Sequence, residues 1–258
     1  MGIRRRVRAF RGIIILSALM QFVQGGYQIK TIPHNSLMIA TNKGFSAFLD
    51  ENEFQNFSSF DIIRFPDNIN FFKVQYNKIS LSVLNFGTLR DQIDNQIFNQ
   101  FDAYEVDLQY YLKKNIVNKF LFNANIGISY SKISILNSCA IISNFKLSSS
   151  IPESNINFAA LINNLGFVLN DYTNKKTILP LSFQGGILYK LYQTSIMLSY
   201  DLIYQYHSGE SQHVASIQIP IGENIKFNLS SSSYRNELLI GDYQYDWFYG
   251  LGCGLSIQ

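Results

Sequence analysis

Hydrophobic and polar side chains alternate over long stretches of the chain, and this alternation is the main structural signal. Between residues 119 and 131 the even positions are apolar, from Phe120 to Tyr130, and the odd positions are polar or small, with Leu121 as the exception. Successive side chains of a β-strand point to opposite faces, so such a strand has one apolar and one polar face. The same pattern recurs over residues 101–112, 195–206 and 245–257.

The length of the alternating runs separates two kinds of β-protein. Several runs span about eleven residues or more, whereas strands of soluble proteins usually have about five or six. A soluble β-sandwich also alternates, but Phe and Tyr at both ends of some apolar faces favour a lipid–water interface. We therefore predict an all-β protein, a transmembrane antiparallel β-barrel in the bacterial outer membrane.

The barrel is expected to contain about 12–14 strands, an even number that lets the sheet close without edges. Asn77-Lys78 and Gly222-Glu223 fit tight hairpin turns, whereas residues 87–100, 170–180, 207–212 and 232–244 are expected to be longer polar connections. Residues 37–49 could add one or two strands. The predicted strands are residues 57–65, 70–76, 79–86, 101–112, 119–131, 135–147, 155–165, 181–190, 195–206, 213–219, 224–231 and 245–257.

The first 25 residues resemble an export signal. Five arginines precede residue 12, and residues 12–23 form an apolar stretch that is short for a membrane-spanning helix. Small or modest residues then favour cleavage between Gly25 and Gly26. The alternative is an uncleaved N-terminal anchor. With cleavage, residues 26–258 form one barrel domain.

Composition agrees with a chain that faces lipid. Charged residues make up 15% of the sequence, against about 25% in globular proteins, because lipid-facing positions accept charge only at a cost. The net charge of +3 comes partly from the arginines of the signal. The basic patches with interleaved aromatic residues that bind nucleic acid are missing. We expect membrane lipid, and no nucleic acid, among the partners.

Candidate chemistry is sparse. Cys139 and Cys253 both fall on apolar faces, so we favour unpaired thiols, although an oxidising periplasm would permit a disulfide. No Cys and His residues have metal-ligand spacing, and we expect no cofactor. Ser211 and His213, with Asp201 or Asp242, could be imagined as a hydrolase site, but nothing in their spacing selects them. We predict a non-enzymatic protein. Charges predicted on the lumen side are Glu105, Asp107, Asp201, Lys119, Lys132 and Lys190.

Several short motifs resemble the PorV/PorQ family, outer-membrane barrels of the type IX secretion system that are related in fold to long-chain fatty-acid transporters. The clearest matches are residues 159–167 with 179–187, and residues 86–89 with 101–105. By this resemblance Asn163, Asn164 and Gly166 form a structural turn and Pro180 starts a strand. The family's Asn-Pro-Ala-rich N-terminal segment is not matched around residues 41–57. Residues 252–257 resemble the signal read by the barrel assembly machinery, although Gln258 replaces a terminal aromatic residue.

The resemblance implies a non-enzymatic component of type IX secretion, with a blocked lumen and with turns or loops that hold partner proteins or cargo. The alternative is a transporter of hydrophobic small molecules such as long-chain fatty acids. That alternative predicts a continuous lumen, a movable N-terminal plug and an apolar pocket inside. A third possibility, a general porin, predicts open conductance.

Overall fold

A computed structural model describes Ile29 and residues 58–64, 69–93, 96–117, 120–173, 176–222, 225–233 and 251–257. The described strands form one antiparallel sheet of 12 strands, paired in chain order from β1 to β12. They are β1 (Ser58–Arg64), β2 (Asn70–Tyr76), β3 (Ile79–Ile93), β4 (Gln96–Val117), β5 (Phe120–Ile133), β6 (Leu136–Ile151), β7 (Ile156–Asn170), β8 (Ser182–Lys190), β9 (Met197–Gln205), β10 (Ser211–Pro220), β11 (Ile225–Ser232) and β12 (Leu251–Ile257), with a short 3-10 helix, η3 (Pro152–Ser154), after β6.

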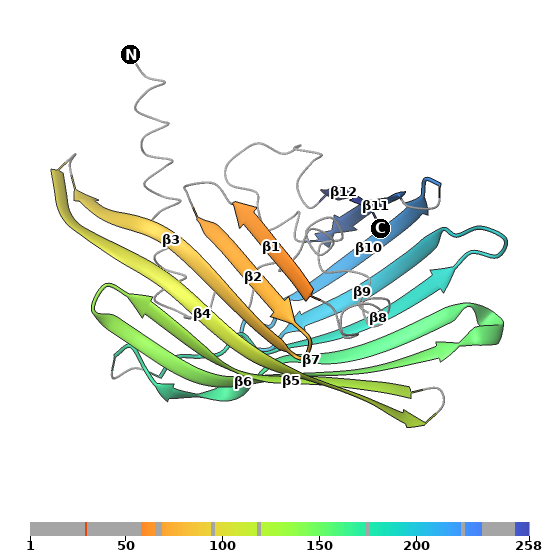
Figure 1. Ribbon diagram of the computed structural model, residues 1–258, viewed down its shortest axis with the longest axis horizontal. Coiled ribbons are helices and arrows are strands. Elements are labelled where there is room, and N and C mark those ends of the chain that lie inside the picture. The colour runs from red at the N-terminus through yellow and green to blue at the C-terminus, as the bar shows by residue number, and fades with distance from the viewer. Residues whose placement is uncertain are drawn as a thin grey trace, which may run out of the picture.

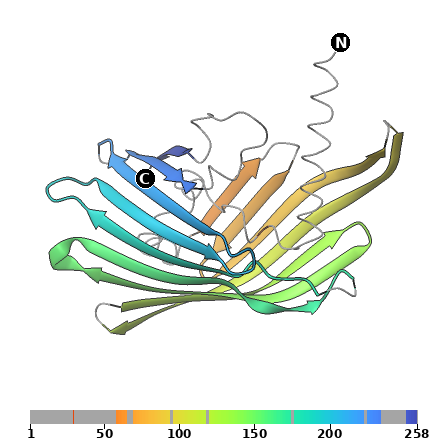
Figure 2. The ribbon, with the colours of Figure 1, turned by 180° about the vertical axis from the view of Figure 1, so that it is seen from behind.

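The sheet curves strongly around a central space (Figure 1), and the view from behind shows the same concave shape (Figure 2). The prediction of an all-β antiparallel protein with about twelve strands is confirmed. The pairs seen among the described residues run from β1–β2 to β11–β12, so direct closure of β12 on β1 stays a prediction. Residues 1–25 and 37–49, including the proposed cleavage position at Gly25 and Gly26, lie outside the described residues.

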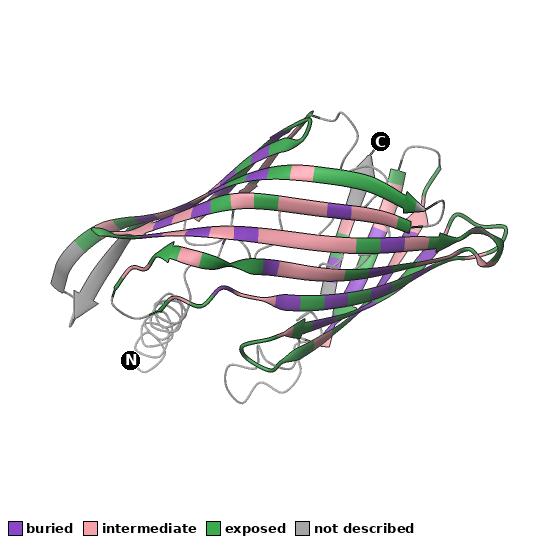
Figure 3. Cartoon of the chain, turned by 90° about the horizontal axis from the view of Figure 1, so that it is seen from below, coloured by how far each residue is buried: buried purple, intermediate pink, exposed green. Residues whose placement is uncertain are grey.

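The sheet has an apolar outer face and a polar inner face. In β5, Ile126 and Ile128 are 50% and 52% exposed, whereas Ser129 and Ser131 are fully buried. In β4 and β9, too, apolar side chains are exposed and polar side chains are buried. Figure 3 shows buried and exposed positions alternating along the strands. A soluble protein buries its apolar side chains instead. The structure is therefore that of an outer-membrane β-barrel, whose outer surface contacts lipid.

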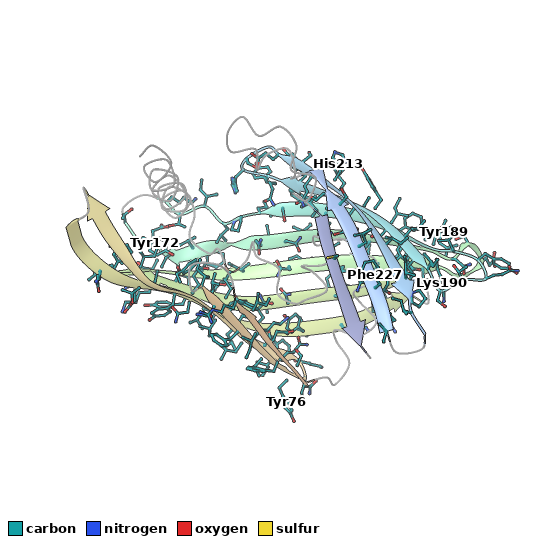
Figure 4. The ribbon with its side chains drawn as sticks, turned by 90° about the horizontal axis from the view of Figure 1, so that it is seen from above. Tyr76, Tyr172, Tyr189, Lys190, His213 and Phe227 are labelled. Carbon is teal, nitrogen blue, oxygen red and sulfur yellow. The ribbon has the colours of Figure 1, made fainter. Side chains whose placement is uncertain are left out.

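Aromatic side chains mark both ends of the outer face. We call the end with residues 77–78 and 191–196 the turn rim, and the end with residues 171–181 and 206–210 the loop rim. Outward aromatic residues near the turn rim are Tyr76, Phe120 and Tyr189, and those near the loop rim are Phe167 and Tyr206. Figure 4 shows Tyr76 pointing away from the barrel, with Tyr189 and Tyr172 at opposite ends. Such girdles are typical of the two membrane interfaces.

The tight turn at Asn77-Lys78 is confirmed, and Asn77 adopts the positive φ of 54° that such turns need. The predicted polar loop over residues 87–100 is wrong. β3 and β4 continue as a paired two-stranded ribbon to Ile93 and Gln96, because each strand supplies the other's backbone partners whatever the side chains are. The ribbon extends beyond β2, whose pairing with β3 stops at Asn70 and Asn85.

One predicted lumen charge belongs to the outer face. Lys132 occupies an even, outward position of β5, and its ammonium lies 5.9 Å from the ring centroid of Tyr104. Since it is close to the end of β5 at the loop rim, it can keep its charge near the interface while its stem covers apolar surface. Glu105, Asp107 and Asp201 are buried at inward positions, as predicted. Lys119 lies outside the described residues.

The facing of β5 has a direct test. Replacing Ile126 by Arg should place a charge in the lipid-facing belt and lower the free energy of unfolding by about 2–4 kcal/mol. Urea unfolding in lipid vesicles, followed by heat-modifiable gel mobility, measures this loss. Ile126→Ala is the matched control, since it shortens the same side chain without charge. Equal stability of the two variants would show that position 126 does not face lipid.

Candidate functional site on the inner wall

The inner wall carries an apolar cluster near the loop rim, and one residue of the N-terminal part of the chain belongs to it. Ile29 is 1% exposed and packs with Phe71 of β2, Leu84 and Phe86 of β3, and Ala103 of β4. Half-buried Ile63, Ile69 and Ile133 pack against the same cluster. We call this position of Ile29 the Ile29 seat. The cluster therefore places a residue from the N-terminal part of the chain against the inner face of the barrel.

A buried carboxylate borders the Ile29 seat. Glu105, which is 1% exposed, lies beside Leu84 in the β3–β4 register. Its Oε2 accepts a hydrogen bond of 2.6 Å from the backbone N–H of Ile29. Its Oε1 accepts a bond of 3.3 Å from Ser131 Oγ. A buried carboxylate needs donors of this kind, because leaving water without replacement bonds is costly.

The inner wall changes from apolar to polar along β4. Ala103 belongs to the apolar cluster, Glu105 borders it, and Asp107 lies one inward position further from the loop rim. The carboxylate of Asp107 accepts bonds from Ser129 Oγ and from Gln109 Nε2, the latter at 2.6 Å. The Ile29 seat therefore lies at the boundary between the two environments, with the Ile29 side chain on the apolar side and its N–H on the polar side.

Inward polar side chains are buried over much of the wall, not only near Ile29. They include residues of β3, β5, β6, β9, β10 and β11 that are at most 6% exposed: Ser80, Ser82, Asn123, Ser129, Ser131, Ser138, Asp201, Ser199, Ser216, Gln218, Asn228, Ser230 and Ser232. A wide water-filled channel would leave such side chains solvated. The described inner wall is thus largely shielded from solvent.

An asparagine ladder crosses the wall from β5 to β7. Asn144 Nδ2 donates to Asn125 Oδ1 at 2.6 Å, and Asn144 Oδ1 accepts from the Asn164 backbone N–H at 2.6 Å. Asn164 Nδ2 then donates to the carbonyl of Pro180 at 2.9 Å. Asn164 has a φ of 60°, and the β6–β7 register shifts at this position. These features define a β-bulge.

The predicted turn at Asn163, Asn164 and Gly166 is therefore wrong, because β7 runs through it to Asn170. The features that suggested a turn are real, since Asn tolerates a positive φ. In the folded sheet, however, β6 continues beside this segment, and its hydrogen bonds turn the irregularity into a bulge. Pro180 precedes β8 by two residues, close to the predicted strand start.

The connection between the end of β7 at Asn170 and the start of β8 at Ser182 contacts the inner face of the sheet. Leu179 is 7% exposed and packs on Ala140 and Ile142, inward residues of β6. Since Asn164 bonds to the neighbouring Pro180 carbonyl, the ladder anchors this part of the connection to the wall. A second apolar patch thus lies inside the barrel on β6 and β7.

The residues considered for hydrolysis are not brought together. His213 is exposed on the outer side, where its Nδ1 lies 2.6 Å from Tyr200 Oη, whereas Asp201 is buried on the inner face. Asp242 lies outside the described residues. Cys139 and Cys253 are both free thiols. Among the described residues, no helix is long and apolar enough to cross a bilayer.

Ile29 was missed by sequence reasoning. It precedes the first alternating run, and a single Ile between Gln28 and Lys30 gives no periodic signal. Glu105 was identified as a lumen residue from its place in the alternation. Its partner could not be identified, because Ile29 and Glu105 are 76 residues apart in sequence.

Comparisons with known proteins give few matches. No family model matches the chain, and no characterised protein matches it by sequence. Among solved structures, the chain is similar to a KdgM porin with a TM-score of 0.35 and 13% identity, over 64% of this chain and 84% of the porin. The PorV/PorQ resemblance is not reproduced by these comparisons.

The bulge predicts that Gly166 tolerates no side chain. A Cβ at this position would lie 2.0 Å from the Ile141 carbonyl oxygen, so the backbone would have to move. Gly166→Ala should cost about 1–3 kcal/mol of stability, as overpacking does, in a urea titration of the folded barrel. Gly185→Ala is the control, since its Cβ would meet nothing within 4 Å. Equal costs for both variants would contradict the close approach of β6 and β7.

Proposed function

We propose that the protein is a gated outer-membrane transporter for small molecules, closed in the described state by a residue of its own N-terminal part. One observation carries this proposal: Ile29 is seated on the inner wall and bonded to buried Glu105. A contact between distant parts of the chain inside a barrel is how a plug is held. The apolar patches inside the barrel favour substrates that are at least partly hydrophobic.

The shielding of the inner wall supports gating over permanent opening. Buried Ser, Asn, Gln and Asp side chains line the inner face, and an open porin would keep them in water. A gated transporter reconciles a shielded inner wall with the passage of a substrate. The plug leaves its seat when a substrate or partner binds the open state better, which shifts the population of the two states.

The type IX secretion role rests on the sequence resemblance. A blocked lumen is compatible with it, but one of its motifs, at residues 163–166, is a bulge within a strand. Cargo display at the cell surface after deletion of the gene tests this role. Normal cargo display in a deletion strain that has no second copy of the gene would contradict the type IX secretion role.

Conductance in planar bilayers tests the gated transporter. Ile29→Asp would place a second carboxylate beside Glu105 in an apolar cluster, and an unpaired buried charge costs several kcal/mol. Since about 1.4 kcal/mol changes an equilibrium tenfold, we expect the open fraction to rise at least about tenfold over the nearly silent parent protein.

The matched control is Ile135→Asp, because Ile135 is 87% exposed in the turn between β5 and β6. It should conduct like the parent protein. A parent protein that is already fully conducting would indicate a general porin. A folded Ile29→Asp variant that stays silent would show that Ile29 does not hold a gate.

A further inference from the structure

The outer face of the sheet contains an apolar hollow over β7 and β8. Two small residues that pair across these strands, Ala160 and Gly185, form its floor, and both are exposed. A Cβ on Gly185 would meet no atom within 4 Å. The hollow has a volume of about 440 Å³ and is lined mostly by residues at outward positions. It therefore lies on the face that contacts lipid.

Larger apolar side chains stand on both sides of the floor. On the β5–β6 side, the rings of Phe122 and Phe145 are stacked with their centroids 6.3 Å apart. On the β8–β9 side are Phe183 and Leu202, which are 40% and 41% exposed. A hydrocarbon chain in the hollow touches the floor and both walls, whereas a smooth surface touches it on one side. Since dispersion attraction grows with the number of atomic contacts, the hollow holds such a chain more firmly than a smooth part of the outer face does.

The row of paired residues through the hollow has the length and slope of one acyl chain. It starts near the turn-rim end of β5 and reaches the loop-rim half of β9, through Phe122, Leu147, Ala160, Gly185 and Leu202. At about 4.8 Å between neighbouring strands, it is about 19 Å long. Strands of such barrels tilt by about 35–45°, so a row perpendicular to them rises by about 11–14 Å. One leaflet of the hydrocarbon core is about 15 Å thick.

A positive charge lies next to the turn-rim end of this row. Lys114 of β4 pairs with Phe122 and follows Tyr110 and Leu112 along the outward positions of its strand. β4 has reached the turn rim here, because the N–H of Tyr111 donates a hydrogen bond to the Lys78 carbonyl. The exposed Lys114 side chain can therefore extend its ammonium into the headgroup layer while its stem lies on apolar surface.

We propose that the hollow binds one acyl chain of an anionic glycerophospholipid whose phosphate is bound by Lys114. The ammonium of lysine binds phosphate as a point charge, and it lies at the end of the row where a headgroup must be. Short turns of outer-membrane barrels lie in the periplasm, so the lipid belongs to the periplasmic leaflet. The site is independent of the proposed gate, because the floor, both walls and Lys114 belong to the outer face.

Native mass spectrometry of the folded protein tests the site. The barrel is released from detergent micelles that contain equal amounts of phosphatidylglycerol and phosphatidylcholine with the same palmitoyl and oleoyl chains. We expect it to retain one phosphatidylglycerol with about fivefold preference over phosphatidylcholine, which is the effect of one lysine near anionic headgroups. Heat-modifiable gel mobility checks that each variant is folded.

Two kinds of variant separate the hollow from the charge. Gly185→Leu fills the hollow and should lower the retention of both lipids by at least about fivefold. If it does not fold, Ala160→Leu fills the same space from β7. Lys114→Gln should lower the retention of phosphatidylglycerol to that of phosphatidylcholine, which itself stays unchanged. Lys114→Arg should keep the preference, because the charge is kept.

Ala215→Leu and Lys132→Gln are the matched controls. Ala215 is a small exposed residue of β10 outside the hollow, and Lys132 is an outward lysine near the loop rim. Both variants should retain lipid like the parent protein, and a loss equal to that of Gly185→Leu or Lys114→Gln would overturn the proposal.

Three other results would also overturn it. The first is a folded parent protein without preference for phosphatidylglycerol, and the second is unchanged lipid retention in the folded Gly185→Leu or Ala160→Leu variant. The third is a preference that survives in Lys114→Gln. A dimer of the parent protein that Gly185→Leu converts to monomers would overturn the proposal by assigning the hollow to a second copy of the chain.

Discussion

Lipid on one side of a single sheet is the constraint on which this structure depends. A strand in a bilayer cannot leave backbone N–H and C=O groups unpaired, so each strand must be paired with its neighbours. The order of the 12 strands follows the chain, and each connection joins adjacent strands. The same lipid requires apolar residues on the outward positions within the hydrocarbon layer, so the polar residues of those strands face inward.

The inward polar residues impose a second requirement, which is a hydrogen-bond partner for each buried polar group. Ser, Asn, Gln, Asp and Glu side chains are buried on the inner wall, and each buried polar group needs partners. The asparagine ladder from Asn125 to Asn164 and the bonds to Asp107 meet this need across neighbouring strands. At Glu105 one donor comes from outside the sheet, from Ile29. The interior is therefore stabilised by hydrogen bonds within the sheet and by one bond from a residue that precedes it.

The hydrogen bond between Ile29 and Glu105 differs from the other bonds of the interior in the part of the chain that supplies its donor. The bulge at Asn164 and the Ser and Gln bonds to Asp107 are made within the sheet or between the sheet and its own connections. The contact of Ile29 with Glu105 instead joins the wall to a residue that precedes β1. A contact of this kind can be broken without breaking strand pairing, which is the property that the proposed gate requires.

Much of the fold could be predicted from alternation alone. All twelve predicted strands have counterparts among the observed ones, and β5 places Ile126 outward and Asn125 inward as the alternation requires. This works because each strand responds to the same two environments, lipid and interior, so its facing is a local property. The strand pairing within residues 87–100 could not be predicted, because this mostly polar stretch lacks the periodic alternation of the other strands.

The candidate site depended on tertiary structure. Glu105 could be placed inside by its position in the sequence, but the neighbours that make it a site come from β2, β3, β5 and the N-terminal part. The motif at Asn164 shows the same limit, since Asn and Gly suit a turn or a bulge equally well. Only the pairing with β6 decides between them. By itself, the sequence determined which side of the wall most strand residues face, with Lys132 as an exception. The packing of distant segments decided what each residue meets there, because such contacts depend on register and on how the sheet brings those segments together.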